Sequence, residues 1–288
     1  MRNIDLDSLE TFKAVVDHGG VAKAAVHLHR VPSNVTTRVK NLEARLGVQL
    51  FARRKGRLSL TPEGQILLQY AERMLSLASE AEDAMKPGQP KGTLRLGTLE
   101  STAASRLAPL LSTYHECYPE VRVELSTGSS TALSGRVQRG ELEAAFVAEP
   151  FNRTGLDMQL AFTEELVLIA PRGMAHANEM VKLSFGTVVA FETGCSYRSI
   201  LDDLLTHLGA TPERVLELAS YHAIIACVAA GAGIAIIPRA VLDVVHASDQ
   251  VHALSIPKRF AHSRTYLVWQ AGHQSSALDS LKSELDRH

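Results

Sequence analysis

Residues 32–46 decide the fold of the N-terminal part of this chain, and they read PSNVTTRVKNLEARL. Val35, Val39 and Leu42 recur at helical spacing and give the stretch one apolar face. A proline suits the first turn of a helix, so the helix begins with that proline or, alternatively, with Ser33 as its cap. The stretch therefore predicts an amphipathic helix whose other face is polar and basic.

Two shorter helices are expected before this stretch and a hairpin after it. Residues 6–16 carry apolar side chains at three- and four-residue spacing, and residues 21–28 are rich in alanine, whose small side chain lets another helix approach closely. Residues 49–60 alternate around a basic turn that contains Gly56. Three short helices and a basic hairpin predict a winged helix-turn-helix domain over residues 1–60.

Positive charge is concentrated in this first domain. The whole chain of 288 residues has a formal net charge of −1, with 30 Lys and Arg against 31 Asp and Glu. Residues 1–60 hold eleven Lys and Arg against five Asp and Glu, whereas the remaining residues hold nineteen against twenty-six. A basic head on an acidic body is expected when only one end of a protein meets nucleic acid.

The candidate DNA contacts lie on the polar face of residues 32–46 and at the tip of the hairpin. Asn34 or Arg38 could make paired hydrogen bonds to a base edge in the major groove. Four of the five residues 53–57 are cations, and we expect them to hold phosphates or to reach the minor groove, although many charge runs are only solvated loops. The candidate DNA-binding residues are Ser33, Asn34, Thr36, Thr37, Arg38, Lys40, Arg53, Arg54, Lys55 and Arg57.

A long linker helix is expected over residues 61–86. Thr61 is a suitable cap, and the proline and glutamate that follow it favour the first turn of a helix. Apolar residues then repeat every three or four positions, which is the heptad pattern of two helices that pack together. The pattern predicts a homodimer through this helix, and the alternative is a helix that lies on its own domain. The predicted seam consists of Leu67, Tyr70, Met74, Leu77, Ala81 and Ala84.

Residues 87–92 contain two prolines and two glycines, so they cannot continue a helix and form a hinge. From residue 93 on, strand patterns alternate with helix patterns, which predicts an α/β sheet with covering helices. The elements expected there include a single helix over 101–117 and strands at 165–170 and 265–269. The predicted fold class is therefore α+β multidomain, and the second part is long enough for two small lobes with a cleft between them.

Residues 4–85 resemble the N-terminal region of LysR-type transcriptional regulators. The motifs that carry the resemblance are Leu9-x-x-Phe12, Ala24-Ala25-x-x-Leu28, Val35-Thr36-x-Arg38-Val39-x-x-Leu42-Glu43, Leu46-Gly47-x-x-Leu50-Phe51-x-Arg53 and Leu60-Thr61-x-x-Gly64. Residues 30–38 resemble, more narrowly, a subgroup that includes putrescine-utilisation regulators. Pro32 departs from the family pattern, because many members have a DNA-contacting glutamine there, so base reading must rest more on its neighbours.

The resemblance extends more weakly through the rest of the chain and implies a sequence-specific transcriptional regulator. It implies a two-lobed, periplasmic-binding-protein-like effector domain, with lobe one at about 93–162 and 269–288 and lobe two at about 163–268. A small carboxylate, amino acid or amine bound between the lobes would then modulate the activity on duplex DNA. We expect DNA-bound dimers to pair through these domains into a homotetramer.

Candidate ligand contacts follow from the rule that open α/β sheets bind ligands beyond the carboxyl ends of their strands, often at helix N-termini. Residues 97–102, 126–130 and 191–198 each follow a strand and open a helix. Their hydroxyls and N–H groups favour a small anion, whereas Glu100 would suit an amine; the alternative role of each Ser and Thr is helix capping. The candidate ligand-binding residues are Glu100, Ser101, Thr102, Thr127, Gly128, Cys195, Ser196, Tyr197, Tyr221 and His222.

The three cysteines, Cys117, Cys195 and Cys227, are far apart in the sequence, so neither a disulfide framework nor a zinc site is expected. Cys195 stands at the predicted N-terminus of a helix, where the pKa of a thiol can be lowered. A thiol- or redox-sensing regulator that acts through Cys195 is therefore an alternative function.

No enzyme activity, metal or cofactor is expected. Gly194-Cys195-Ser196 lacks the spacing of a nucleophile elbow, and Gly231-Ala232-Gly233 lacks the third glycine of a nucleotide loop. A ligand-binding module without DNA function is another alternative, but it leaves the basic first domain unexplained. The sequence has no apolar run of about eighteen residues and no apolar signal core near its start, so a cytoplasmic protein is expected.

Overall fold

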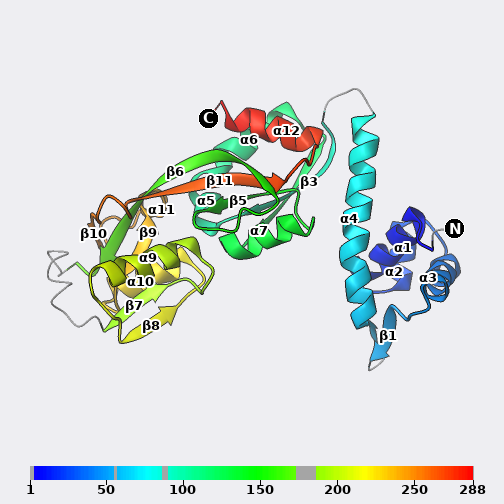
Figure 1. Ribbon diagram of the computed structural model, residues 1–288, viewed down its shortest axis with the longest axis horizontal. Coiled ribbons are helices and arrows are strands. Elements are labelled where there is room, and N and C mark those ends of the chain that lie inside the picture. The colour runs from blue at the N-terminus through cyan, green and yellow to red at the C-terminus, as the bar shows by residue number, and fades with distance from the viewer. Residues whose placement is uncertain (1–2, 55–56, 86–89, 173–185, 288) are drawn as a thin grey trace. The chain divides into compact units, whose positions relative to one another are not determined.

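The computed structural model describes residues 3–54, 57–85, 90–172 and 186–287. The chain divides into two compact units (Figure 1). The first is made mainly of Met1–Pro87, and the second of Gly88–Gln138 and Leu142–His288. Each unit has buried hydrophobic clusters of its own.

The first unit is a winged helix-turn-helix followed by a long helix. Its elements are α1 (Leu6–Asp17), α2 (Val21–His27), α3 (Pro32–Leu46), β1 (Phe51–Arg54), β2 (Arg57–Leu60) and α4 (Pro62–Ala84). Strands β1 and β2 pair antiparallel, as expected for the hairpin. Ala24 and Ala25 of α2 are buried to 1% exposure or less, and their small size lets α2 lie close to α1 and α3.

Helix α3 begins with Pro32 in its first turn, behind Val31 at the cap position. Of the two predicted starts, the proline rather than the Ser33 cap is therefore correct. The three apolar residues of the predicted face are buried. The helix ends at Gly47, whose φ of 70° is a left-handed conformation that glycine adopts without steric cost.

Glu43 is a buried charged residue that joins α3 to the hairpin. Its Oε1 accepts the backbone N–H of Leu50 at 2.8 Å and that of Phe51 at 3.3 Å, and the residue is only 8% exposed. A buried carboxylate is tolerated where its oxygens accept hydrogen bonds. Glu43 therefore fixes the path of the chain between the end of α3 and the start of β1.

Thr61 caps α4, as expected from the sequence. Its Oγ1 accepts the N–H of Gly64 at 3.0 Å and donates to the carbonyl of Gln49 at 2.7 Å. The same side chain thus satisfies a free N–H in the first turn of α4 and anchors the return of the hairpin.

Two residues of the predicted seam along α4 pack within their own unit. Leu67 is buried in the core of its own unit, and Met74 packs partly buried against the same cluster. These two residues therefore follow the alternative of a helix lying on its own domain. The exposed apolar residues of α4 instead include Ile66, Tyr70 and Leu77, which are 58%, 55% and 64% exposed.

The second unit is a larger α/β domain. Its helices are α5 (Glu100–Ser105), α6 (Leu107–Cys117), α7 (Ser130–Gln138), α9 (Ser196–His207), α10 (Tyr221–Ala229), α11 (Arg239–Val244) and α12 (Ser276–Leu285). Its strands are β3 (Gly92–Thr98), β4 (Val121–Thr127), β5 (Ala144–Ala148), β6 (Leu156–Ala170), β7 (Thr187–Ala190), β8 (Arg214–Glu217), β9 (Ala235–Pro238), β10 (His252–Leu254) and β11 (His262–Gln270). Seven of these strands form one sheet in the order β10-β6-β11-β5-β3-β4, with β9 paired to β6, and β7 pairs with β8.

Two long strands, β6 and β11, connect the ends of this unit. Residues 156–165 of β6 pair with β11, whereas residues 166–170 pair with β9 and β10. Figure 1 shows β6 and β11 running together from the end that carries α12 to the end that carries β9 and β10. The predicted boundary between the lobes, near residue 163, falls inside β6.

The prediction of a single helix over 101–117 is wrong. The structure has two helices, α5 and α6, which are separated at Arg106 with φ −128°. Pro109 gives the physical reason, because a continuous helix would need its missing N–H to bond to Ser105 and would place its ring against that carbonyl. In the structure Pro109 lies in the first turn of α6, where no such bond is required.

The second unit also contains more strand than the sequence predicts. β6 begins at Leu156 rather than at residue 165, and β8 and β10 were not expected. All four residues of β8 are exposed, so this strand has no alternation between a buried and an exposed face. Short strands of this kind carry little periodic signal.

Replacement of Glu43 by alanine is expected to lower the free energy of unfolding by about 1–3 kcal/mol, because the N–H groups of Leu50 and Phe51 lose their acceptor. Glu43→Gln keeps an oxygen at the same place and should cost less. Urea unfolding followed by far-ultraviolet circular dichroism measures both changes. An unfolding midpoint that is the same in Glu43→Ala as in the natural protein would contradict this role.

Candidate functional site

The polar face of α3 is the first candidate site. Its exposed predicted DNA contacts are Ser33, Asn34, Thr37 and Lys40. Thr36 is half-buried, and its hydroxyl donates to the carbonyl of Pro32 at 2.9 Å. The structure thus gathers short polar side chains and one lysine on the face opposite the buried apolar residues.

Arg38 differs from the other predicted contacts because its guanidinium is already paired. It forms an ion pair with Asp7 of α1, and its Nε donates to Asn34 Oδ1 at 3.1 Å. Asp7 also accepts a hydrogen bond from Arg30 Nη2 at 2.7 Å. Arg38 therefore links α3 to α1, and a contact with a base would require it to share or leave these partners.

The hairpin candidates are described in part. Lys55 lies outside the described residues. The backbone of Arg53 and Arg54 lies in β1 and that of Arg57 in β2, so all three residues flank the turn of the hairpin.

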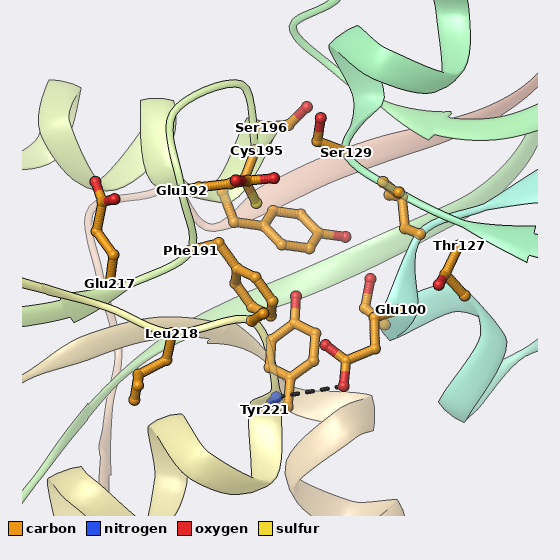
Figure 2. A pocket seen from close by; sticks show the side chains of 15 residues that line it. Glu100, Thr127, Ser129, Phe191, Glu192, Cys195, Ser196, Glu217, Leu218 and Tyr221 are labelled. Carbon is orange, nitrogen blue, oxygen red and sulfur yellow. Dashed lines mark hydrogen bonds between the residues drawn. The ribbon is translucent and has the colours of Figure 1, made fainter. Parts of the chain in front are cut away.

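A cavity of about 410 Å³ in the second unit is the second candidate site (Figure 2). The starts of α5, α9 and α10 contribute to its wall, together with the segments that follow β4, β7 and β8. Eight of the ten predicted ligand residues line it: Glu100, Ser101, Thr127, Gly128, Cys195, Ser196, Tyr197 and Tyr221. Thr102 and His222 are not among the lining residues.

Seven lining residues were not selected from the sequence: Leu99, Ser129, Phe191, Glu192, Glu217, Leu218 and Ala219. Four of them, Leu99, Ser129, Phe191 and Glu192, belong to the segments 97–102, 126–130 and 191–198 selected from the sequence. Residues 217–219 lie at and after the end of β8, so the failure to predict this strand also hid its contribution to the cavity.

Glu100 links the start of α5 to the start of α10 at the cavity wall. Its Oε1 accepts the N–H of Tyr221 at 3.4 Å, which is the dashed line in Figure 2. Burial raises the pKa of Glu100 above its usual value, and the Tyr221 N–H and the nearby His222 only partly offset this effect. The carboxylate is thus partly dehydrated without full compensation from protein groups.

Three aromatic residues, Phe191, Tyr197 and Tyr221, contribute to the cavity wall. Figure 2 shows Phe191 beside Tyr221, and their ring centroids are 4.7 Å apart with one edge against the other face. Burial raises the pKa of Tyr197, and the charge of Glu164 adds to this effect. The Tyr197 hydroxyl therefore keeps its proton at neutral pH and can donate a hydrogen bond.

Ser196 serves the fold as well as the cavity wall. Its hydroxyl donates to the carbonyl of Ala148 at 2.6 Å and lies 2.8 Å from the Oγ of Ser130. The Ser130 Oγ in turn accepts the N–H of Ala148 at 3.1 Å. These buried groups satisfy one another, so Ser196 fastens the start of α9 to β5 and α7.

Cys195 does not have the environment that the thiol-sensing alternative requires. Burial raises the pKa of its thiol, and the N–H groups of Arg198 and Tyr197 lower it only in part. The sequence had suggested a lowered pKa at this helix start. A protonated thiol is a poor nucleophile, so the structure gives no support to a redox role for Cys195.

Comparisons with known proteins match both units. Residues 6–65 match the family described as bacterial regulatory helix-turn-helix protein, lysR family, and residues 87–288 match the LysR substrate binding domain. An uncharacterized HTH-type transcriptional regulator of Bacillus subtilis, YusT, is 35% identical over 94% of this chain and 91% of its own length. GltR, another HTH-type transcriptional regulator of Bacillus subtilis, is 32% identical over 92% of this chain and 90% of its own length.

A solved structure has the same fold from end to end. Full-length CbnR, determined in complex with its target DNA, covers 99% of both chains with a TM-score of 0.68 at 23% identity. The chain belongs to the LysR family: it is a DNA-binding transcriptional regulator with an effector-binding domain. This confirms the predicted fold class and the predicted general function, and it excludes the alternative of a ligand-binding module without DNA function.

The structure describes residues 3–54, 57–85, 90–172 and 186–287. Within those ranges, no helix combines the length and the apolar character that crossing a membrane requires. Among the same residues, no group of three or more His, Cys, Asp or Glu side chains is placed to hold a metal ion.

Glu100→Gln is expected to make the ligand-free protein more stable at neutral pH. The folded pKa of Glu100 lies above its unfolded value, so the wild-type protein loses stability as the pH rises through that pKa, and a neutral side chain does not. The gain should disappear below pH 4.5, the ordinary value for glutamate. Thermal unfolding at neutral pH and at about pH 4 measures the difference.

Glu192→Gln is the matched control, because Glu192 also lines the cavity but is exposed. It should leave the unfolding temperature unchanged at both pH values. A loss of stability in Glu100→Gln at neutral pH would show that the carboxylate is fully compensated in the fold.

Proposed function

We propose that this LysR-family regulator reads duplex DNA with α3 and responds to a small molecule in the cavity of its second unit. The proposal that α3 reads DNA is supported by the row of exposed polar side chains on this helix, opposite a buried apolar face. The proposed domains are the winged helix-turn-helix at 1–60, the linker helix at 61–86, the hinge at 87–92 and the effector domain at 93–288. Residues 86–89 lie outside the described residues.

The proposed contacts fall into two groups. On α3, Ser33, Asn34, Thr36, Thr37 and Arg38 face base edges, and Lys40 meets the phosphate backbone. On the hairpin, Arg53, Arg54, Lys55 and Arg57 hold phosphates. Contacts to base edges give sequence preference, whereas contacts to phosphates give affinity that falls with salt.

Asn34→Ala and Lys40→Ala should therefore weaken DNA binding in different ways. Loss of a base contact at Asn34 should cost about 1–3 kcal/mol on operator DNA and little on unrelated DNA. Loss of a phosphate contact at Lys40 should weaken binding to operator and to unrelated DNA alike. It should also reduce the slope of log affinity against log salt concentration by about 1. Fluorescence anisotropy with a duplex from upstream of the protein's own gene gives both quantities.

Equal losses on operator and unrelated DNA in the Asn34→Ala protein would argue against base reading at this position. A purified natural protein that ignores duplex DNA even in dilute buffer would contradict the whole proposal.

The proposed homodimer forms through α4. The support is a stripe of exposed apolar side chains, Ile66, Tyr70 and Leu77, that returns to the same side of the helix. Large apolar side chains that repeat along one helix face are usually covered by a partner. Two such helices would set the distance between the two winged helix-turn-helix domains on the operator.

Leu77→Glu should weaken the dimer because it places two like charges in the proposed contact. Gln65→Glu adds the same single charge to α4, but roughly 120° around the helix axis from Leu77. Sedimentation velocity over a range of protein concentrations should show dissociation of Leu77→Glu and not of Gln65→Glu. The same behaviour in both variants would contradict a dimer contact through this face.

The proposed homotetramer joins dimers through their second units. Two strands at the margins of their described sheets support it, β4 and β8. Both carry exposed apolar side chains: Leu125 of β4 is 43% exposed, and Val215 and Leu216 of β8 are 41% and 37% exposed. Strand edges of this kind are ready partners for another chain.

The proposed effector is a small carboxylate, amino acid or amine in the cavity. Its binding would favour one arrangement of the lobes, and so change the angle between the DNA heads and the bend of the operator. A ligand that binds tightly and leaves operator footprint and bend unchanged would contradict this mechanism. Resemblance to putrescine-utilisation regulators remains an analogy, and the cytoplasmic location expected from the sequence stays a prediction.

A further inference from the structure

The charged side chains that line the cavity are all carboxylates. Among the fifteen described residues that line it there are three carboxylates, Glu100, Glu192 and Glu217, and no Lys, Arg or His. Glu217 has a cation nearby, because Arg198 Nη1 lies 3.4 Å from its Oε1. Figure 2 shows Glu100 and Glu217 on opposite sides of Phe191. The lining therefore offers a ligand carboxylates and no cation, although Arg198 lies behind Glu217.

At three helix starts near the cavity, N–H groups face the protein's own side chains. The N–H of Tyr221 at the start of α10 already bonds to Glu100. The first-turn N–H groups of Tyr197 and Arg198 in α9 already face the sulfur of Cys195. Near the start of α7, the N–H of Ala132 faces the Oγ of Ser129 at 3.4 Å. Some of the N–H donors that would suit an anionic ligand are thus occupied by the protein's own side chains, whereas the start of α5 has no side-chain cap.

Glu100 has one oxygen that is not used. Its Oε2 is buried, and no group among the described residues makes a hydrogen bond to it. The raised pKa of Glu100 reports the same lack of compensation. A buried carboxylate oxygen without a partner is costly, and an ammonium group is the ligand that compensates it best.

Two buried hydroxyls lie at the same wall. Ser101 and Tyr197 are each 3% exposed, and neither hydroxyl oxygen has a partner in hydrogen-bonding geometry among the described residues. The hydroxyls of Ser101 and Thr265 nevertheless lie near that of Tyr197, and Ser101 also lies near Tyr221. An ammonium group has three N–H donors and no acceptor, so it can bond to a carboxylate and to hydroxyl oxygens together. The rings of Phe191 and Tyr221 add a surface that attracts cations.

We infer that the cavity binds an organic ammonium ion with a small apolar body, and that Glu100 is its counter-ion. This inference rests on the proposed function, in which the cavity is the effector site. It narrows the effector from three classes to those that carry an ammonium group, which are amines and amino acids. The apolar body would lie against Leu99 and Leu218, which also line the cavity.

Four compounds with the same six-carbon chain test the charge that the cavity prefers. They are hexylamine, 6-aminohexanoate, hexanoate and 1-hexanol, and isothermal titration calorimetry with the full-length protein gives their affinities. Hexylamine and 6-aminohexanoate should bind more tightly than hexanoate and 1-hexanol, and their order distinguishes an amine from an amino acid as the effector class. Tighter binding of hexanoate than of hexylamine would overturn the inference, as would the failure of both ammonium compounds to bind.

Glu100→Gln keeps an acceptor for the Tyr221 N–H and removes the charge. It should weaken the binding of the ammonium compounds roughly tenfold or more and change the affinity for 1-hexanol little. Because the variant is expected to be more stable at neutral pH, weaker binding would not reflect unfolding. Glu217→Gln is the matched control, since this carboxylate is exposed and near Arg198, and its effect should be several times smaller. Equal losses in the two variants would overturn the role of Glu100.

Ala219→Phe separates this inference from the proposed function. Ala219 lines the cavity and is exposed, so the added ring should fill space without changing charge or unfolding the protein. Hexanoate binding that Ala219→Phe abolishes would overturn the ammonium assignment and keep the cavity as the effector site. Hexylamine binding that Ala219→Phe leaves unchanged would contradict the cavity as the site, and with it both proposals.

Discussion

The antiparallel pairing of β6 with β11 is the constraint on which the second unit depends. The N-terminal part of β6 pairs with β11, which also pairs with β5, and the C-terminal part of β6 belongs with β9 and β10. The register shifts opposite Thr265 and Tyr266 of β11, which pair with Phe162 and Leu160, so Ala161 is an extra residue in β6. Backbone hydrogen bonds along these continuous strands fix the two ends of the sheet relative to each other. The starts of α5, α9 and α10 can therefore face one cavity although they are far apart in the sequence.

The first unit was predictable from the sequence because its signals are local. The proline and glycine that bound α3, the cap at Thr61 and the alternating hairpin each act within a few residues. The exception was α4, where Leu67 and Met74 fit a heptad but serve their own core. Periodicity identifies an apolar face, and it does not say which surface covers that face.

The second unit was less predictable because its decisive contacts are distant in sequence. Eight predicted ligand residues nevertheless line one cavity. They were chosen by the rule that ligands bind beyond the carboxyl ends of the strands, which depends on the order of elements and not on distant contacts. The contribution of residues 217–219 was missed together with the short strand β8. The break between α5 and α6 is different, since Pro109 is a local signal in the sequence that disfavours a continuous helix. The raised pKa values of Glu100 and Cys195 depend on burial, which no local pattern encodes.

The ion pair between Asp7 and Arg38 has a consequence for how the reading head responds to ionic strength. Binding of a cationic side chain to DNA is favoured by the release of condensed counter-ions from the phosphates. A guanidinium that carries its own carboxylate partner is already neutralised, so it displaces fewer of these ions than a free lysine does. The entropy gained from released counter-ions when α3 binds the duplex is therefore smaller than the number of its basic residues suggests.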